Sequence, residues 1–211
     1  MTIIDLSHPI TPGMPVYPGT QGPVFEEAAT IGQDHFAEQR LSLATHTGTH
    51  VDAPAHILPG GHTLDLLPAG LFVGSAVVVD VSGVAPGAAI PLPLLLDHAA
   101  RLHGLDFVLL RTGWERHWGA DAYFADYPVL SEDAARWLAA RGFKGLGVDA
   151  VSFDPVASLR NHSILLAAPM VLVENLANLA ILPDMPFTFS CLPLPLAGAD
   201  GSPVRAVALL D

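Results

Sequence analysis

The sequence predicts a single mixed α/β domain. Short segments rich in Val, Leu and Phe have strand character, and they alternate with a few helical segments. No Ser/Gly-rich linker, charge block or internal repeat divides the 211 residues. A hydrophobic fraction of 51% in a chain of this length is enough to build a sizeable core. We therefore expect one domain over residues 1–211.

Seven segments are predicted to be strands. Residues 38–45 alternate polar with apolar side chains, which is typical of a half-buried strand, and they lead into a stretch that contains Gly and Pro. The other six are short, apolar and rich in β-formers: residues 75–81, 106–111, 145–149, 170–174, 186–191 and 203–210.

Two helices are predicted. Residues 132–141 follow Ser131 as N-cap, carry acidic residues in the first turn, and end with Arg141 before Gly142. A second helix is expected over residues 93–103, with Pro93 tolerated in its first turn. The loops between these elements are the expected place for any chemistry.

Composition and charge exclude several classes of protein. Nine Lys and Arg against 21 Asp and Glu give a net charge of −12 with His neutral, which repels phosphate backbones, so no nucleic acid partner is expected. The longest apolar stretches, 71–81 and 84–96, are short and interrupted by Asp, Gly or Pro, so no membrane span is expected. High hydrophobicity with few charges indicates a large core and also an interface in a homodimer or higher homo-oligomer.

The cysteine count and the N-terminal segment indicate a cytoplasmic protein. Cys191 is the only Cys and cannot form an intrachain disulfide, so nothing requires an oxidising compartment. The first ten residues lack the basic region and the apolar run of a signal peptide. Cys191 lies in an apolar strand candidate without an activating neighbour, so we interpret it as a core thiol.

Residues 46–56, HTGTHVDAPAH, are the densest group of metal-ligating side chains in the chain. They place His46, His50, Asp52 and His56 within eleven positions. The Gly and the Pro between them disfavour a regular helix, so an irregular loop around a metal ion is expected. The alternative is an ordinary His-rich surface loop, but the density of ligands favours metal binding. Six other His residues, taken one by one, more often have ordinary structural roles: His8, His35, His62, His98, His103 and His117.

The ligand types indicate what kind of metal site this is. Imidazole and carboxylate suit zinc, manganese, iron or nickel, and the absence of nearby Cys argues against a structural zinc site. Three such ligands leave coordination positions open, as a catalytic site requires. The ligands do not distinguish Zn²⁺ from Mn²⁺.

The same segment resembles the H-x-G-T-H-x-D-x-P-x-H motif of the cyclase family of metal-dependent hydrolases, which includes kynurenine formamidases and isatin hydrolases. The opening DLSHPITPGMPVYPG and the later LAGADGSPVRAVAL resemble the N-terminal and C-terminal segments of that family, so the resemblance spans nearly the whole chain. It implies a mixed α/β domain of the swivelling β/β/α type, with a central β-barrel-like core flanked by helices, in homodimers or higher oligomers.

The resemblance also assigns site residues. It implies that His46, His50 and Asp52 bind one metal ion and that His56 is the acid/base. A later His and a Glu twelve positions beyond it complete a two-metal site in such proteins, both carboxylates bridging; His162 and Glu174 stand at that separation.

The residues themselves support Glu174 more than His162. Glu174 is the only acidic residue between Asp154 and Asp184, and it ends the apolar run MVLVE, where a buried carboxylate is costly unless it is paired or binds a metal. The alternative for Glu174 is a solvated strand end. His162, between two polar residues, could simply lie on a polar turn, and its assignment depends on the resemblance.

Tyr17 is the candidate for substrate binding. Kynurenine formamidases carry a Trp where this chain has Tyr17, and an Asp where it has Thr20. Tyr17 still offers a ring face, so an aromatic or flat small-molecule substrate is expected, while kynurenine specificity is left open. Alternatively, Tyr17 is only a residue held extended before Pro18.

We therefore hypothesise a metal-dependent hydrolase that cleaves an amide, formamide, lactam or lactone by metal-bound hydroxide, with one or two divalent ions per chain and His56 as acid/base. A covalent mechanism is disfavoured because no G-x-S-x-G motif occurs. Two alternatives stay open: a metal-dependent cyclase or isomerase acting on a carbonyl substrate, and a non-catalytic metal-binding member of the family.

Overall fold

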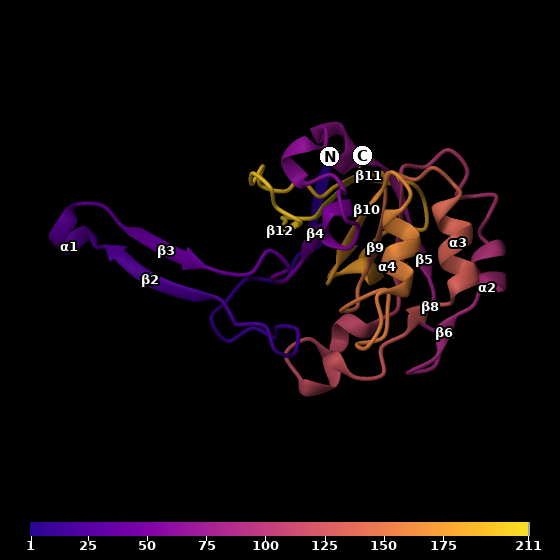
Figure 1. The fold of residues 1–211 in the computed structure, drawn as a ribbon, viewed down its shortest axis with the longest axis horizontal. Helices are drawn as coiled ribbons and strands as arrows, with labels where there is room; N and C mark the ends of the chain where they lie inside the picture. Colours follow the sequence, from indigo (N-terminus) through magenta and orange to yellow (C-terminus); the bar gives the residue numbers. More distant parts are fainter. Residues whose placement is uncertain (211) are drawn as a thin grey trace.

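The computed structural model describes residues 1–210, which are organised around one nine-stranded sheet (Figure 1). Four neighbouring strands in the middle of the sheet are parallel to one another, namely β5, β7, β9 and β10. Every other pair of neighbours is antiparallel. In sheet order the strands are β1 (Thr2–Asp5), β13 (Val207–Leu210), β11 (Phe187–Ser190), β5 (Val73–Asp80), β7 (Phe107–Arg111), β9 (Gly145–Val148), β10 (Val171–Glu174), β4 (His50–Asp52) and β12 (Gly201–Pro203).

The sheet is curled into a half-barrel, and the chain path requires this shape. Only residues 204–206 separate β12, at one edge, from β13, next to the other edge. The four Cα–Cα steps from Pro203 to Val207 span at most about 14 Å, so the two sides of the sheet lie close together. The Leu6 amide donates to the Ala206 carbonyl over 2.9 Å, and Ser7 forms a β-bridge with Leu176. The predicted mixed α/β domain with a barrel-like core is confirmed.

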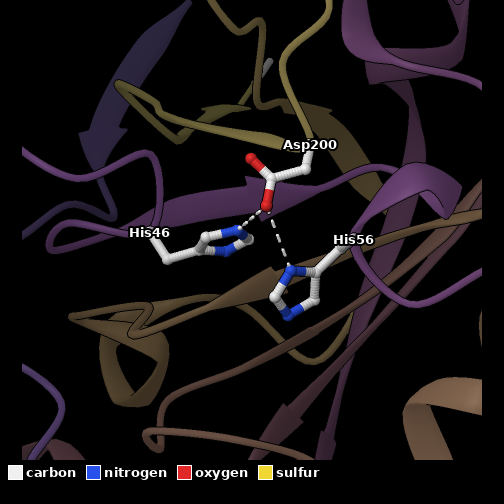
Figure 2. Close-up of side chains that lie close together, drawn as sticks. All are labelled: His46, His56 and Asp200. Carbon is white, nitrogen blue, oxygen red and sulfur yellow. Dashed lines mark hydrogen bonds and ion pairs between the residues drawn. The ribbon is translucent and has the colours of Figure 1, made fainter. Parts of the chain in front are cut away.

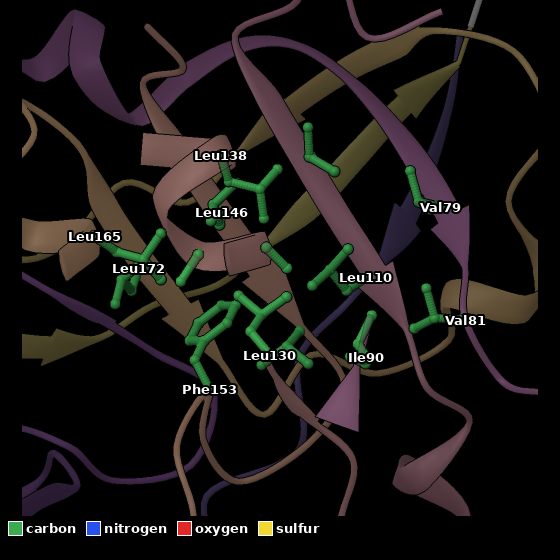
Figure 3. Packing of buried hydrophobic residues seen from close by; sticks show 14 of the residues in the cluster. Val79, Val81, Ile90, Leu110, Leu130, Leu138, Leu146, Phe153, Leu165 and Leu172 are labelled. Carbon is green, nitrogen blue, oxygen red and sulfur yellow. The ribbon is translucent and has the colours of Figure 1, made fainter. Parts of the chain in front are cut away.

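Each face of the sheet covers its own hydrophobic core. Phe107 and Leu109 on β7 point into the half-barrel, whereas Val108 and Leu110 point toward the helices. Figure 3 shows the core on the helix side. On the inner face β9 carries glycine: a Cβ on Gly145 would lie 2.8 Å from the Val171 carbonyl oxygen, so only glycine allows this approach. The predicted core thiol of Cys191 is confirmed, since the side chain is fully buried.

The helices are short. The predicted helix 132–141 is confirmed as α3, and Ser131 caps it by accepting from the Ala134 amide. The four α-helices are α1 (Ile31–Asp34), α2 (Leu92–Leu96), α3 (Glu132–Ala139) and α4 (Arg160–Leu166). Six 3₁₀ turns complete the set: η1 (Pro54–His56), η2 (Leu64–Leu66), η3 (Ala69–Phe72), η4 (Trp114–His117), η5 (Asp121–Phe124) and η6 (Leu179–Ile181). Within residues 1–210, no helix is both long and apolar enough to cross a membrane.

Two predicted elements have the wrong extent. The helix expected over 93–103 stops at Leu96, and the chain continues in tight turns in which each amide bonds mostly three residues back. Within this stretch only Leu95 and Leu102 are buried, and successive turns bury both side chains without a continuous helix. The strand expected over 203–210 is two strands, because the chain leaves β12 and crosses to β13 between them.

A hairpin of β2 (Val24–Ala29) and β3 (Glu38–Ser42), with α1 at its tip, projects away from the body (Figure 1). The prediction of a half-buried strand at 38–45 is wrong, since every residue of β3 is exposed. The alternating pattern does form a strand, but among residues 1–210 it pairs only with β2 and covers no larger sheet. The two remaining strands, β6 (Ala89–Ile90) and β8 (Val129–Leu130), form a small parallel pair beside the main sheet.

Candidate metal centre

The register of β10 against β4 brings three candidate ligands to one face of the sheet. Glu174 lies opposite His50, and Leu172 lies opposite Asp52. Because side chains alternate along a strand, all four point toward the helix side, where Leu172 belongs to the core. His50, Asp52 and Glu174 are 3%, 1% and 6% exposed, so the strand ends carry buried polar groups directly beyond the apolar core.

Helix α4 adds His162 to this face. The ring is buried, and its Nε2 lies 3.1 Å from Glu174 Oε1 and 3.5 Å from Asp52 Oδ2. Asp154 fixes the ring on the other side: its Oδ2 accepts from the His162 amide and lies 2.8 Å from Nδ1. A carboxylate that accepts at Nδ1 leaves Nε2 facing the two acidic side chains, as in ligating His residues held by a second carboxylate.

His50 is oriented in the same manner by the backbone. Its Nδ1 lies 2.8 Å from the Gly48 carbonyl oxygen, which can only accept, so Nδ1 carries the hydrogen. Nε2 then lies 3.2 Å from Asp52 Oδ1 and 3.5 Å from Glu174 Oε2. Asn175 secures Gly48 from the other side by donating to the same carbonyl over 2.9 Å.

His46 and His56 have side chains that are 25% and 26% exposed, and they form the more open side of the site with Asp200. Figure 2 shows these three side chains together. His46 Nδ1 lies 2.7 Å from Asp52 Oδ1, and its Nε2 lies 3.0 Å from Asp200 Oδ2. His56 Nδ1 lies 3.3 Å from the same Asp200 oxygen. The His46 and His56 ring centroids are 4.0 Å apart, so the two imidazoles are in contact.

Mutual electrostatic interactions dominate the titration of these groups. Burial opposes the charged form of each, but the Asp52 and Asp200 carboxylates outweigh burial and raise the pKa of His46 to about 9. His162 has its pKa raised in the same way by Asp154, Asp52 and Glu174, and the neighbouring His residues hold the pKa of Asp52 well below its ordinary value. His56 differs, because burial prevails and lowers its pKa.

Two carboxylate oxygens show that a cation fits here. Asp52 Oδ2 and Glu174 Oε1 are buried, and neither accepts a hydrogen bond from any residue within 1–210. An unpartnered buried carboxylate oxygen is costly unless a cation satisfies it. Two sets of nitrogen and oxygen donors lie within 4.8 Å of one another and share Asp52: His46, His50 and Asp52, and Asp52, His162 and Glu174. Such donors suit a divalent ion, and the two sets have room for one or two.

A cavity of about 550 Å³ opens above these groups. One wall carries the aromatic side chains of Trp118, Tyr123, Phe124 and Tyr127, and His56 and Glu174 are among the polar residues that line it. Tyr17 lies on the rim, 41% exposed, and its hydroxyl donates to the Val156 carbonyl over 2.8 Å. The arrangement can hold a flat apolar group next to the candidate metal ligands.

Comparison with known proteins agrees with this geometry. The Cyclase family model, described as "Putative cyclase", matches residues 4–155. The chain belongs to the cyclase family. It is 36% identical over 206 residues to a kynurenine formamidase of Maricaulis maris (strain MCS10), covering 96% of this chain and 95% of the relative. Among solved structures, isatin hydrolase A from Labrenzia aggregata bound to benzyl benzoate is similar, with a TM-score of 0.87, 28% identity, and 98% and 93% of the two chains covered.

A second solved structure bears on the metal. A protein described as a potential metal-dependent hydrolase with cyclase activity is 30% identical to this chain, with a TM-score of 0.80 and with 98% and 96% of the two chains covered. The similarity of fold, together with the unpartnered carboxylates, indicates a divalent-metal site in this chain as well.

The structure brings the five predicted metal ligands and the predicted acid/base His56 together, and Tyr17 stands apart at the rim of the cavity. The motif is only partly the irregular loop that its Gly and Pro predicted: His50–Asp52 forms strand β4 inside the sheet, and Pro54–His56 is a 3₁₀ turn. Sequence reasoning missed Asp154, Asn175 and Asp200. Asp200 lies in the LAGADGSPVRAVAL segment that carried the resemblance, which is the one signal that could have found it.

Proposed function

We propose that this member of the cyclase family is a metal-dependent hydrolase that opens an amide, formamide, lactam or lactone bond on a substrate with a flat aromatic group. The observation that carries the proposal is a pair of buried carboxylate oxygens, on Asp52 and Glu174, which make no hydrogen bond among the described residues, in a site next to an aromatic-lined cavity. The relatives named for formamidase and isatin hydrolase activity support the reaction class.

The ligand set follows from the donor geometry. His46, His50 and Asp52 would hold one ion, and His162 and Glu174 a second, with Asp52 shared. Glu174 also faces His50 and can therefore contribute to both positions. The ion, when bound, polarises the scissile carbonyl and promotes attack by water. Asp154 and the Gly48 carbonyl hold the ligating rings in place, so that little reorganisation is needed at the moment of reaction.

His56 would move the proton. It lines the cavity but adds no donor to the two sets that share Asp52, and its Nδ1 is engaged by Asp200, which leaves Nε2 available. The lowered pKa of His56 keeps the ring neutral at pH 7, so it can take a proton from water and then pass it to the leaving nitrogen or oxygen. Protonation matters most for an amine, because an amide anion is a very poor leaving group.

The finer attributes are part of the same proposal. We infer Zn²⁺ or Mn²⁺, since nitrogen and oxygen donors suit both. We also infer a homodimer or higher homo-oligomer, because Ile31, Phe36 and Leu41 on the projecting hairpin are 71%, 55% and 53% exposed. A cytoplasmic location is consistent with a lone, buried Cys191.

Metal analysis and a substrate screen test the proposal. Protein purified without added metal is analysed for bound ions and then assayed with N-formyl arylamines, isatin and small aromatic lactones, with ¹⁸O-labelled water as solvent. Hydrolysis that requires the metal and incorporates the label is expected. Turnover without incorporation would instead favour a cyclase or isomerase acting on a carbonyl. A metal-loaded protein inactive on all these substrates would favour a non-catalytic member of the family.

A further inference from the structure

Asp200 contacts both the candidate ligand His46 and the candidate acid/base His56. Its Oδ2 lies 3.0 Å from His46 Nε2 and 3.3 Å from His56 Nδ1, so one carboxylate oxygen serves two imidazoles (Figure 2). The other oxygen, Oδ1, accepts from the Thr45 hydroxyl over 3.0 Å. With His46 and His56 it forms a third group of possible donors within 4.8 Å, separate from the two donor sets around Asp52, and none of its three members is fully buried.

The main chain around Asp200 is fixed from two sides. The Ala53 amide donates to the Asp200 carbonyl over 2.9 Å, and the next residue, Gly201, pairs with Asp52 across the β12–β4 ladder. Gly201 is necessary for this arrangement, because a Cβ there would lie 2.6 Å from Cε1 of His46. The imidazole of His46 therefore rests against the backbone of residue 201 while the Asp200 carboxylate meets its edge.

A carboxylate can only accept hydrogen bonds, which determines where the hydrogens lie. His46 carries a hydrogen on Nε2, and His56 carries one on Nδ1. Nδ1 of His46 also faces a carboxylate oxygen, Asp52 Oδ1, at 2.7 Å, so without an ion this nitrogen carries a hydrogen as well. An ion held by Asp52 would take the place of that hydrogen and leave the one toward Asp200. The nitrogen of His56 that is free of Asp200 is Nε2. The same Asp200 oxygen thus turns Nδ1 of His46 toward Asp52 and Nε2 of His56 away from itself.

We propose that Asp200 is the positioning residue of this site: it directs Nδ1 of His46 to the metal and keeps Nε2 of His56 as the nitrogen that exchanges protons with substrate. The proposal rests on the proposed function for the role of the two rings. It adds that the first His of the motif binds through Nδ1, and that ligand and acid/base are aligned by the same carboxylate.

The direct test uses Asp200→Asn, which keeps the size of the side chain and removes its charge. The first readout is the ¹⁵N chemical shifts of His56 in zinc-loaded protein labelled at histidine, which report the tautomer without any assay of turnover. In the parent protein we expect the Nδ1–H form of His56. In the variant we expect a mixture of the Nδ1–H and Nε2–H forms, since an amide can also donate to a ring nitrogen.

The second readout is the division between kcat and KM on whichever substrate the screen finds. Mutation of a carboxylate that orients a ligating His typically lowers metal affinity or activity by about 10-fold to 100-fold. We therefore expect kcat to fall by about that factor in Asp200→Asn, with KM within about twofold of the parent value. An unchanged His56 tautomer together with an unchanged kcat would overturn the proposal. Because the tautomer is read without substrate, failure of the proposed function would not be mistaken for failure of this inference.

Two further variants separate positioning from mere anchoring of the loop. Asp65→Asn is the matched control: Asp65 accepts from the Gly198 amide and so holds the same loop, but it touches neither ring. We expect it to leave the His56 tautomer and kcat unchanged. Gly201→Ala should displace His46, the side chain nearest to the added Cβ, and so lower metal affinity while the Asp200 carboxylate keeps the His56 tautomer as in the parent. If Asp65→Asn reproduced the effects of Asp200→Asn, the carboxylate would be only a loop anchor.

Discussion

Glu174 and His50 face each other across the β10–β4 pair, with Oε2 of the carboxylate 3.5 Å from Nε2 of the imidazole. The backbone register alone therefore joins a residue of the HTGTHVDAPAH motif to one far away in the sequence. Because side chains in a ladder alternate, a slip of one residue in either strand would turn that strand's group into the apolar interior of the half-barrel. The metal centre is thus a direct product of strand pairing.

Removing the Glu174 charge is expected to weaken metal binding without unfolding the protein. Glu174→Gln keeps the volume of the side chain but replaces one ligand oxygen by an amide nitrogen. Residues that only orient a ligand contribute up to about 100-fold to metal affinity, so we expect the loss of a ligand to lower the affinity by more than that. Elemental analysis after dialysis against a competing chelator measures this. Glu27→Gln on the projecting hairpin is the control. A parental metal content in Glu174→Gln would refute its assignment as a ligand.

His56→Ala is expected to separate turnover from metal binding. The variant should retain its metal, since the two donor sets around Asp52 are intact, while kcat falls by about 10²-fold to 10⁴-fold, the usual contribution of a general acid/base. His62→Ala, a change at an exposed His in the adjacent loop, should behave as the parent protein does. Near-parental hydrolysis by His56→Ala would show that another group moves the proton.

Chelation is expected to lower thermal stability as well as activity. Without an ion, Asp52 and Glu174 bring buried negative charge close together, and a ligand that binds only the folded state at 100 times its Kd adds about 2.7 kcal/mol to the free energy of unfolding. Differential scanning calorimetry with EDTA, and then with excess Zn²⁺, should show a loss and a recovery of Tm. A Tm that ignores both treatments would contradict a resident metal.

His8 is expected to make the protein less stable toward acid. It stacks on Trp118 with ring centroids 3.9 Å apart, and burial lowers its pKa from 6.5 to about 4. The unfolded chain therefore binds a proton at a higher pH than the folded protein does, so this contribution to stability is complete above pH 6.5 and is lost as pH falls toward 4. Urea titrations of metal-free protein should show that the free energy of unfolding falls less between pH 7 and pH 5 in His8→Phe than in the parent. If it fell equally in both proteins, His8 would be charged in the folded state.

Tyr17 is expected to influence KM more than kcat. Tyr17→Phe loses the hydrogen bond to the Val156 carbonyl at the rim of the cavity, and an exposed bond of this kind is worth roughly 0.5–1 kcal/mol, about twofold to fivefold in KM. Tyr17→Trp enlarges the aromatic face at the rim and should favour aryl formamides over small lactones. Steady-state kinetics on both substrate types checks this, and unchanged KM values in both variants would remove Tyr17 from the substrate site.

The elements that the sequence predicts well are those whose signal is local. Strand β7 and helix α3 carry complete local patterns, an apolar run and a capped amphipathic turn. The extent of residues 203–210 could not be predicted, because the break between β12 and β13 is set by partners at opposite edges of the sheet. For β3, the alternation is real, but whether its apolar face is covered depends on groups outside the hairpin.

The candidate site follows the same division. His46, His50, Asp52 and His56 are close in sequence and form a recognisable motif, whereas His162 and Glu174 needed a resemblance to be joined to them. Asp154 and Asp200 act by holding imidazole rings, a role that depends on tertiary contacts and leaves no periodic pattern in the chain. Residues of this kind can be identified only from the folded structure, in which the paired strands bring them into contact with the imidazole rings.

The connection of residues 204–206 across the half-barrel has a consequence for the order of folding. His46 and Asp200 are 154 positions apart, and contacts of that separation form only after a large loop has been closed. During synthesis His46, His50 and Asp52 leave the ribosome early and must wait for β10, α4 and β12 before their partners exist. High-affinity uptake of metal should therefore mark the completion of the fold, and an incomplete chain should be unable to retain the ion.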